Sequence, residues 1–66
     1  MNWDRVEGNW HTFKGKLQQK WGKLTGDDIN VIEGKRAELR GRLQQRYGVA
    51  KGEAERQIDT WLNSVN

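Results

Sequence analysis

The sequence predicts an all-α fold, a compact array of three longer helices and one short helix in a single domain over residues 1–66. Apolar side chains recur at intervals of three and four residues, which is the spacing of one face of an α-helix. The chain has no Pro, no β-branched alternation and no hairpin signal, so strands are not expected. Glycines and a Thr-Gly-Asp-Asp turn separate the periodic stretches and set the expected helix boundaries.

The first helix is predicted from an apolar stripe whose members are four, three, four and four residues apart: Val6, Trp10, Phe13, Leu17 and Trp21. At 100° per residue these five side chains lie within about 80° of arc. Asn2 is a candidate cap for a first turn, and Asn9 is an alternative cap for a helix that starts at Trp10. We expect this helix to end near Trp21–Gly22, with Gly22 in the left-handed conformation.

The short helix is expected to follow Thr25. Thr25 and Asp28 have the spacing of a capping box, with Asp where Glu is usual. Helix capping therefore accounts for Asp27 and Asp28, and we assign the pair no catalytic role. Glu33–Gly34 is expected to end the helix. A compact apolar cluster lies between these two signals: Ile29, Val31 and Ile32.

Two longer helices complete the array. One runs from Lys35 to a closing Gly48, and its apolar residues repeat every four positions: Leu39, Leu43 and Tyr47. The last helix begins near Lys51 with a weak start, because Ala50 is a poor cap and Gly52 costs about 1 kcal/mol relative to Ala. Its apolar face consists of Ala54, Ile58, Trp61, Leu62 and Val65.

An internal repeat underlies this pattern, with copies at about 6–27 and 32–53 that are identical at eight of 22 aligned positions. The glycines of each copy stand seven residues apart: Gly8, Gly15 and Gly22, then Gly34, Gly41 and Gly48. On a helix, Gly15 points roughly 160° away from the apolar stripe. Three interpretations stay open: close approach of a second backbone or chain, a helix that opens easily, or duplication without present purpose.

The composition indicates a small and marginally stable domain. The apolar fraction is 33%, the charged fraction is 32% and the mean hydropathy is −1.09, values that lean toward disorder. Six aromatic residues favour folding, because each can bury about 150–250 Å². We expect Trp10, Trp21 and Trp61 in the core, whereas the pattern assigns Trp3 least clearly to the core. A core of this size supplies about 3–5 kcal/mol of net stability.

Several classes of protein are excluded or disfavoured. The absence of Cys excludes disulfides and thiolate metal sites. No signal peptide or membrane-length apolar run is present, so we expect a cytoplasmic protein, and a monomer. His11 is alone, Ser64 has no adjacent base, and the glycines form no nucleotide-binding motif. We therefore expect no enzymatic activity, no metal and no cofactor.

Basic side chains are concentrated in the two copies of the repeat, although the net charge is only +3. One interpretation is a phosphate-binding surface for RNA, DNA or anionic lipid. The other is a solvated flank whose aliphatic stems cover core edges and whose cations favour helix C-termini. We favour the flank, because a pI of 9.6 is not decisive and no Arg–aromatic readout motif is present. The candidate contacts are Lys14, Lys16, Lys20, Lys23, Lys35, Arg36, Arg40, Arg42 and Arg46.

Five short motifs occur in a specific order: GNW at 8–10, FKGK at 13–16, WGKLT at 21–25, IEGKR at 32–36 and QRYG at 45–48. With these motifs, nearly the whole chain closely resembles the CsbD-like family of small bacterial stress-response proteins. The resemblance implies a cytosolic protein induced under general stress, with short helices in which two helical hairpins cross, and no established activity or cofactor. The chain departs from the family pattern at Ala50 and Gly52, which weakens the last helix.

Three hypotheses for function follow. The favoured one is a non-enzymatic stress protein that acts through weak contacts, as a hydrophilic protectant of other macromolecules. The second is a nucleic-acid-binding module that uses the basic side chains of both repeat copies. The third is an interaction module for a protein partner, through the glycine face and an aromatic left exposed, with Trp3 as the candidate.

Overall fold

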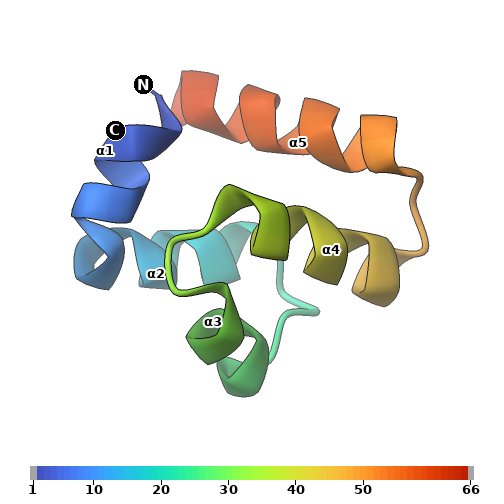
Figure 1. Cartoon of the computed structure of the whole chain (residues 1–66), viewed down its shortest axis with the longest axis horizontal. Coiled ribbons are helices and arrows are strands. Elements are labelled where there is room, and N and C mark those ends of the chain that lie inside the picture. Colours follow the sequence, from blue (N-terminus) through green and yellow to red (C-terminus); the bar gives the residue numbers. More distant parts are fainter. Residues whose placement is uncertain (1, 66) are drawn as a thin grey trace.

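The computed structural model describes residues 2–65, which contain five helices and no strand. In chain order the helices are α1 (Trp3–Gly8), α2 (Trp10–Lys20), α3 (Gly26–Ile32), α4 (Arg36–Tyr47) and α5 (Lys51–Ser64) (Figure 1). The predicted all-α class is confirmed. The helix count differs from the prediction by one, because the short α1 precedes α2 as a separate element.

The two N-terminal helices divide at Asn9. The predicted cap at Asn2 is confirmed, because its Oδ1 accepts a hydrogen bond from the Arg5 N–H at 3.2 Å. The Asn9 side chain makes no cap to α2; its Nδ2 donates to the Arg5 carbonyl at 3.0 Å and so closes α1. Both helices still bury their shared apolar stripe, although Trp10 is only partly buried.

The helix boundaries around α3 follow the predicted signals. The Thr25 N–H donates to Asp28 Oδ2 at 2.9 Å, and the Asp28 N–H donates to Thr25 Oγ1 at 3.1 Å, which completes the capping box. At its other end α3 closes with two left-handed residues, Glu33 at φ 46° and Gly34 at φ 80°. The prediction that Val31 belongs to the apolar cluster was wrong: Val31 is 45% exposed, because Ile29 and Ile32 form the buried side of α3.

The predicted left-handed glycine is confirmed at the end of α4 and wrong at the end of α2. Gly48 has φ 66°, and its N–H donates to the Gln44 carbonyl at 3.0 Å. The end of α2 is Trp21 at φ −116°, and Gly22 is not left-handed. There the chain turns so that the Leu24 N–H reaches the Trp21 carbonyl at 3.1 Å, and burial of Leu24 fixes this path.

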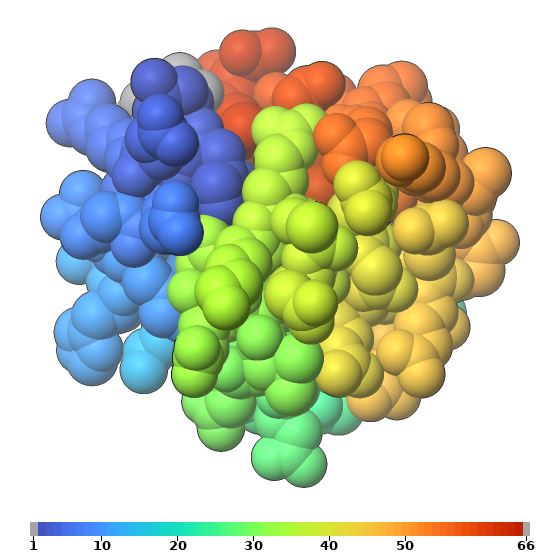
Figure 2. Space-filling view, viewed as in Figure 1, coloured from blue at the N-terminus to red at the C-terminus, as the bar shows by residue number. Residues whose placement is uncertain are grey.

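The helices pack around one core. Helices α4 and α5 run antiparallel as a hairpin, α1 and α2 lie to one side, and α3 lies at the edge opposite α5 (Figure 1). The space-filling view shows α4 in contact with α5 along this face, with α3 beneath (Figure 2). The buried apolar residues come from all five helices and the loop after α2: Val6, Phe13, Leu17, Trp21, Leu24, Ile29, Ile32, Leu39, Leu43, Ala54, Ile58, Trp61 and Leu62.

Trp61 is at the centre of the aromatic packing. Its ring centroid lies 5.6 Å from that of Trp21, and 6.4 Å from those of Phe13 and Trp3. These distances are within the range of favourable aromatic pairs. Trp3 also donates its indole N–H to the Gly34 carbonyl at 2.6 Å, which attaches α1 to the turn between α3 and α4. Trp3 is thus packed against the core and does not supply an exposed aromatic anchor.

Candidate anion-binding site

The arginines at the start of α4 are paired with acids of α5. Arg36 donates through Nη2 to Glu55 Oε2 at 3.0 Å and to Asp59 Oδ1 at 2.8 Å. Arg40 Nη1 lies 3.7 Å from Glu55 Oε1. Because both arginines and both acids are spaced four residues apart, each pair shares one helix face, and the hairpin brings the two faces together. These cations therefore stabilise the α4–α5 contact and are less available to an external anion.

The arginines at the end of α4 converge on Asp28, the one buried ionisable side chain within residues 2–65 at 1% exposure. Arg46 binds both carboxylate oxygens, at 2.8 Å through Nε and 3.0 Å through Nη2, and Arg42 Nη1 lies 3.4 Å from Oδ1. The hydrogen bonds from Arg46 and from the Thr25 N–H lower the pKa of Asp28 from 3.8 to about 2. Helix capping therefore explains Asp28 only in part, and the prediction that capping alone accounts for it was wrong.

The candidate lysines lie on α2, in the loop after it and directly before α4, and they are arranged differently from the arginines of α4. Within residues 2–65, Lys14, Lys20, Lys23 and Lys35 make no ion pair. The Lys23 ammonium lies over the Tyr47 ring at 5.2 Å, and the Lys16 ammonium lies 5.5 Å from the Phe13 ring centroid. The nine candidate contacts thus separate into four arginines on α4 that pair with acids and five lysines, of which Lys14, Lys20, Lys23 and Lys35 make no ion pair within residues 2–65.

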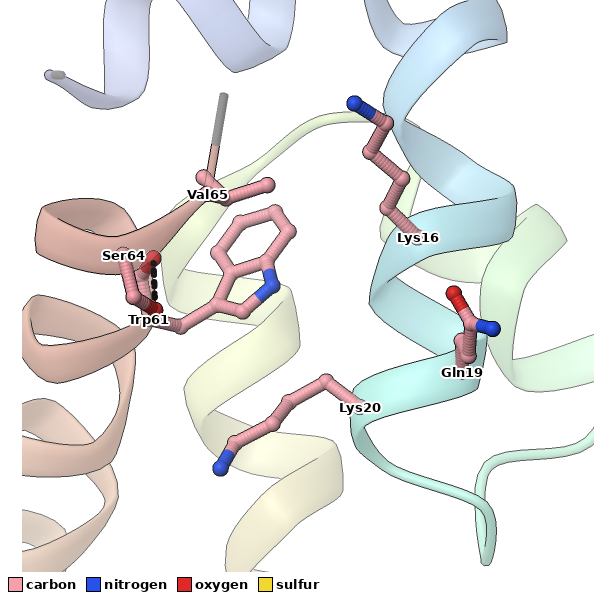
Figure 3. Close-up of a pocket in the computed structure, with 6 residues that line it drawn as sticks. All are labelled: Lys16, Gln19, Lys20, Trp61, Ser64 and Val65. Atoms are coloured by element: carbon pink, nitrogen blue, oxygen red, sulfur yellow. Dashed lines mark hydrogen bonds between the residues drawn. The ribbon is translucent and has the colours of Figure 1, made fainter.

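A hollow of about 460 Å³ opens between the second half of α2 and the end of α5. Figure 3 shows its lining, which comes from α2, from the end of α5 and from the residue after α5: Lys16, Gln19, Lys20, Trp61, Ser64 and Val65. The Ser64 hydroxyl donates to the Trp61 carbonyl at 3.1 Å. The indole nitrogen of Trp61 faces α2, between the stems of the two lysines (Figure 3). No Asp or Glu is among the residues that line this hollow.

Two further hollows have different linings. One, of about 420 Å³, has Lys20 in common with the first hollow, but its Arg56 pairs with Glu53 at 2.6 Å and its Gln57 accepts from Trp21 Nε1 at 3.1 Å. The other, of about 380 Å³, lies between α2 and α3 and includes His11 and Lys14. Of these three hollows, the first is the one that a tryptophan N–H without an acceptor within residues 2–65 faces.

The described residues show no assembly of metal-ligating side chains. No three His, Cys, Asp or Glu residues within 2–65 come together as a metal site, and His11 is exposed on α2. No helix in this range has the length and hydrophobicity needed to cross a membrane.

Sequence reasoning missed two features of this region, the ion pairs between α4 and α5 and the indole N–H of Trp61 that faces the hollow. The Arg36/Arg40 and Glu55/Asp59 spacings could have indicated a charged contact between two helices, since opposite charges with the same period match on a hairpin. The donor role of Trp61 had no sequence signal, because nothing local distinguishes its N–H from those of the other core tryptophans.

Comparison with known proteins gives the chain its family. The sequence model described as CsbD-like matches residues 4–56. The chain is 54% identical over 65 residues to a UPF0337 protein of Rhodopseudomonas palustris, covering 98% of both chains. It is 59% identical over 61 residues to a UPF0337 protein of Agrobacterium fabrum, covering 92% of this chain and 91% of that one. The UPF0337 protein YjbJ of Escherichia coli O6:H1 is 54% identical over 61 residues, with 92% and 88% covered. The chain therefore belongs to the CsbD-like family of general stress-response proteins.

Proposed function

We propose that this chain is a non-enzymatic stress protein that acts in the cytoplasm as a monomeric, hydrophilic protectant of other macromolecules. The observation that carries the proposal is the closed core: Val31 is the one large hydrophobic residue exposed within residues 2–65. A surface without a contiguous apolar patch contacts clients weakly and keeps a protein dispersed at high concentration. Membership of a general stress-response family supplies the biological context for this function.

The test is to dry or heat a labile enzyme with rising amounts of this protein and to measure the enzyme activity recovered. We expect recovery to rise with the mass ratio, and to change little when salt is added, because the contacts are unspecific. An unrelated helical protein of similar size and charge is the control. Absence of protection at every ratio, or protection no better than the control, would overturn the proposal.

Nucleic-acid binding is a second candidate, supported by Lys14 and Lys20 of α2 and Lys23 of the following loop, which make no ion pair within residues 2–65. Their charge can displace counterions from phosphates, whereas the α4 arginines first have to break their pairs with acids. The interface we propose is therefore centred on α2 and its following loop, at Lys14, Lys20 and Lys23. It involves the α4 arginines less than the two-copy hypothesis requires.

A salt-titrated binding assay tests this candidate. If about three phosphates are contacted, the logarithm of the affinity falls with a slope of about −2 to −3 against the logarithm of the salt concentration. Replacing Lys14, Lys20 and Lys23 by Gln should remove most of that slope, and Lys51→Gln is the matched control on α5. Failure to bind DNA or RNA even at low salt would exclude this function.

A further inference from the structure

We propose that the hollow between α2 and α5 is a binding site for a small phosphate-bearing anion, with the indole N–H of Trp61 and the ammonium of Lys20 as its principal donors. The inference does not depend on the protectant function, because it concerns a discrete site with its own ligand. The volume of the hollow, about 460 Å³, lies within the range of about 300–1,000 Å³ that small-molecule sites occupy.

The N–H of Trp61 belongs to a buried side chain and has no acceptor in the described part of the chain. Trp61 is only 5% exposed. Two other tryptophans have protein acceptors for this group, Trp3 at the Gly34 carbonyl and Trp21 at Gln57 Oε1. Buried tryptophan N–H groups usually find a partner, so a donor that opens into a hollow indicates a ligand or a solvent acceptor there.

The rest of the lining selects the charge of that acceptor. Lys20 supplies positive charge from α2, Gln19 adds an amide that can donate, and no Asp or Glu within residues 2–65 lines the hollow. The Ser64 hydroxyl hydrogen is directed to the Trp61 carbonyl, so this hydroxyl does not donate to the ligand. An anion with several acceptor oxygens matches donors supplied by two helices, with the indole N–H of Trp61 between the lysine stems (Figure 3), and lysine is a common partner of phosphate.

Neighbouring features distinguish this site from a merely basic surface. The adjoining hollow shares Lys20, but its Arg56 is held by Glu53 and the Trp21 N–H is already bound. Lys14, on the same helix, lines a different hollow toward α3. The proposal therefore predicts that two lysines of α2 with the same formal charge differ in their effect on anion binding.

The experiment is a titration of the ¹⁵N-labelled protein with inorganic phosphate at constant ionic strength, followed by the indole N–H resonances. We expect the Trp61 signal to shift and saturate, while the Trp21 and Trp3 signals change little because their N–H groups have protein acceptors. Lys20→Gln should weaken binding about fivefold, the upper end for an exposed charge pair. Lys14→Gln removes the same charge outside the hollow and should change the affinity less than twofold.

Two further measurements identify the ligand chemistry and protect the test against misfolding. A 5′-mononucleotide should bind where the corresponding nucleoside and acetate do not, since the site is proposed for the phosphate group. Trp61→Phe keeps an aromatic ring but removes the donor, so it should lose affinity; circular dichroism checks its fold, and Lys20→Gln decides the test if that fold fails. The proposal is overturned if Trp61 does not respond to phosphate, if all indoles shift alike, or if Lys14→Gln weakens binding as much as Lys20→Gln.

Discussion

Asp28 has structural roles in two different elements. Its carboxylate caps α3 through the Thr25 N–H and also binds Arg46, on α4, through both oxygens. Hydrogen bonds to charged groups contribute about 1.5–3 kcal/mol, and a buried carboxylate depends on them to offset its desolvation. This one side chain therefore joins the capping of a short helix to the position of the longer helix that follows.

Replacement of this carboxylate tests that role. Asp28→Asn should lower the free energy of unfolding by about 1.5–3 kcal/mol, because the amide cannot accept from Arg46 with both atoms and carries no charge. Asp27→Asn is the matched control: Asp27 is in the same first turn but exposed, so its loss should cost less than about 1 kcal/mol. Urea unfolding of both variants measures the difference, and equal losses would contradict the assignment.

The same residue predicts a dependence of stability on acid. The folded-state pKa of Asp28 is about 2 against an ordinary 3.8, so its carboxylate is more stable ionised in the folded protein. A depressed folded pKa contributes stability that is complete above about pH 4 and is lost as the pH falls toward 2. The charged and capping groups that face it are Arg46, Arg42 and Thr25.

The measurement is the difference in unfolding free energy between the parent chain and Asp28→Asn across this pH range. We expect the difference to be largest near neutral pH and to shrink between about pH 4 and 2. The comparison with Asp28→Asn is needed because Glu53, held by Arg56, also has its pKa lowered to about 2 and titrates in the same window. A pH-independent difference would show that the ion pairs with Asp28 add nothing to stability.

At the scale of the helices, the glycines fall into two groups with opposite expectations. Gly15 and Gly41 lie within α2 and α4, and an added Cβ would meet no neighbouring atom within 4 Å. Within the described chain no other backbone needs these positions to be bare. Gly48 has φ 66° and Gly34 has φ 80°, where an L side chain is strained, and a Cβ on Gly34 would also lie 3.3 Å from Glu7 Cα.

Substitution by Ala separates the two groups. Gly15→Ala and Gly41→Ala should each stabilise the protein by about 0.5–1 kcal/mol, which raises Tm by several degrees in a domain of this size. Gly48→Ala should lower Tm, because Ala in the left-handed region costs about 1–2 kcal/mol. Thermal unfolding followed by circular dichroism measures all three. A fall in Tm for Gly15→Ala would mean that a contact outside the described chain requires the bare helix face.

The weak start of α5 was expected from the sequence and is present in the structure. Ala50 is the residue before α5 and makes no side-chain cap, although its backbone is extended as at other N-caps. Ala50→Ser should therefore supply the missing acceptor and add about 0.5–1 kcal/mol of stability. Hydrogen exchange at the first turn of α5 should slow in this variant; unchanged exchange would indicate that the cap does not form.

At the scale of the whole molecule, the aromatic cluster connects the N-terminal helices to the C-terminal one. Trp61 on α5 contacts Trp3 on α1, Phe13 on α2 and Trp21 at the end of α2. Because a single core holds all five helices, the chain should unfold in one cooperative transition. Tryptophan fluorescence and far-ultraviolet circular dichroism are then expected to give the same midpoint. Earlier loss of the fluorescence signal would show that α1 and α2 separate before the α4–α5 hairpin melts.

The sequence alone predicted the all-α class, the capping box at Thr25, the left-handed end at Gly48 and most of the buried residues. These features depend on spacing and capping within a few residues, and such interactions are local. Local rules also set the limit of that prediction. They predicted a left-handed helix end at Gly22 as at Gly48, although burial of Leu24 decides the path of the chain after α2. They also predicted that Val31 belongs to the apolar cluster of α3, whereas its side chain is exposed to solvent.

The tertiary structure decided which charges and donors are free. Asp28 and Arg46 are 18 residues apart in the chain, and Trp3 and Gly34 are 31 apart, so both contacts exist only because the helices dock. The same docking pairs the α4 arginines with α5 and leaves the N–H of Trp61 open beside the lysines of α2. The composition gives only the number of these groups. Packing determines which of them an anion can reach, because distance and burial set the energy of each electrostatic interaction.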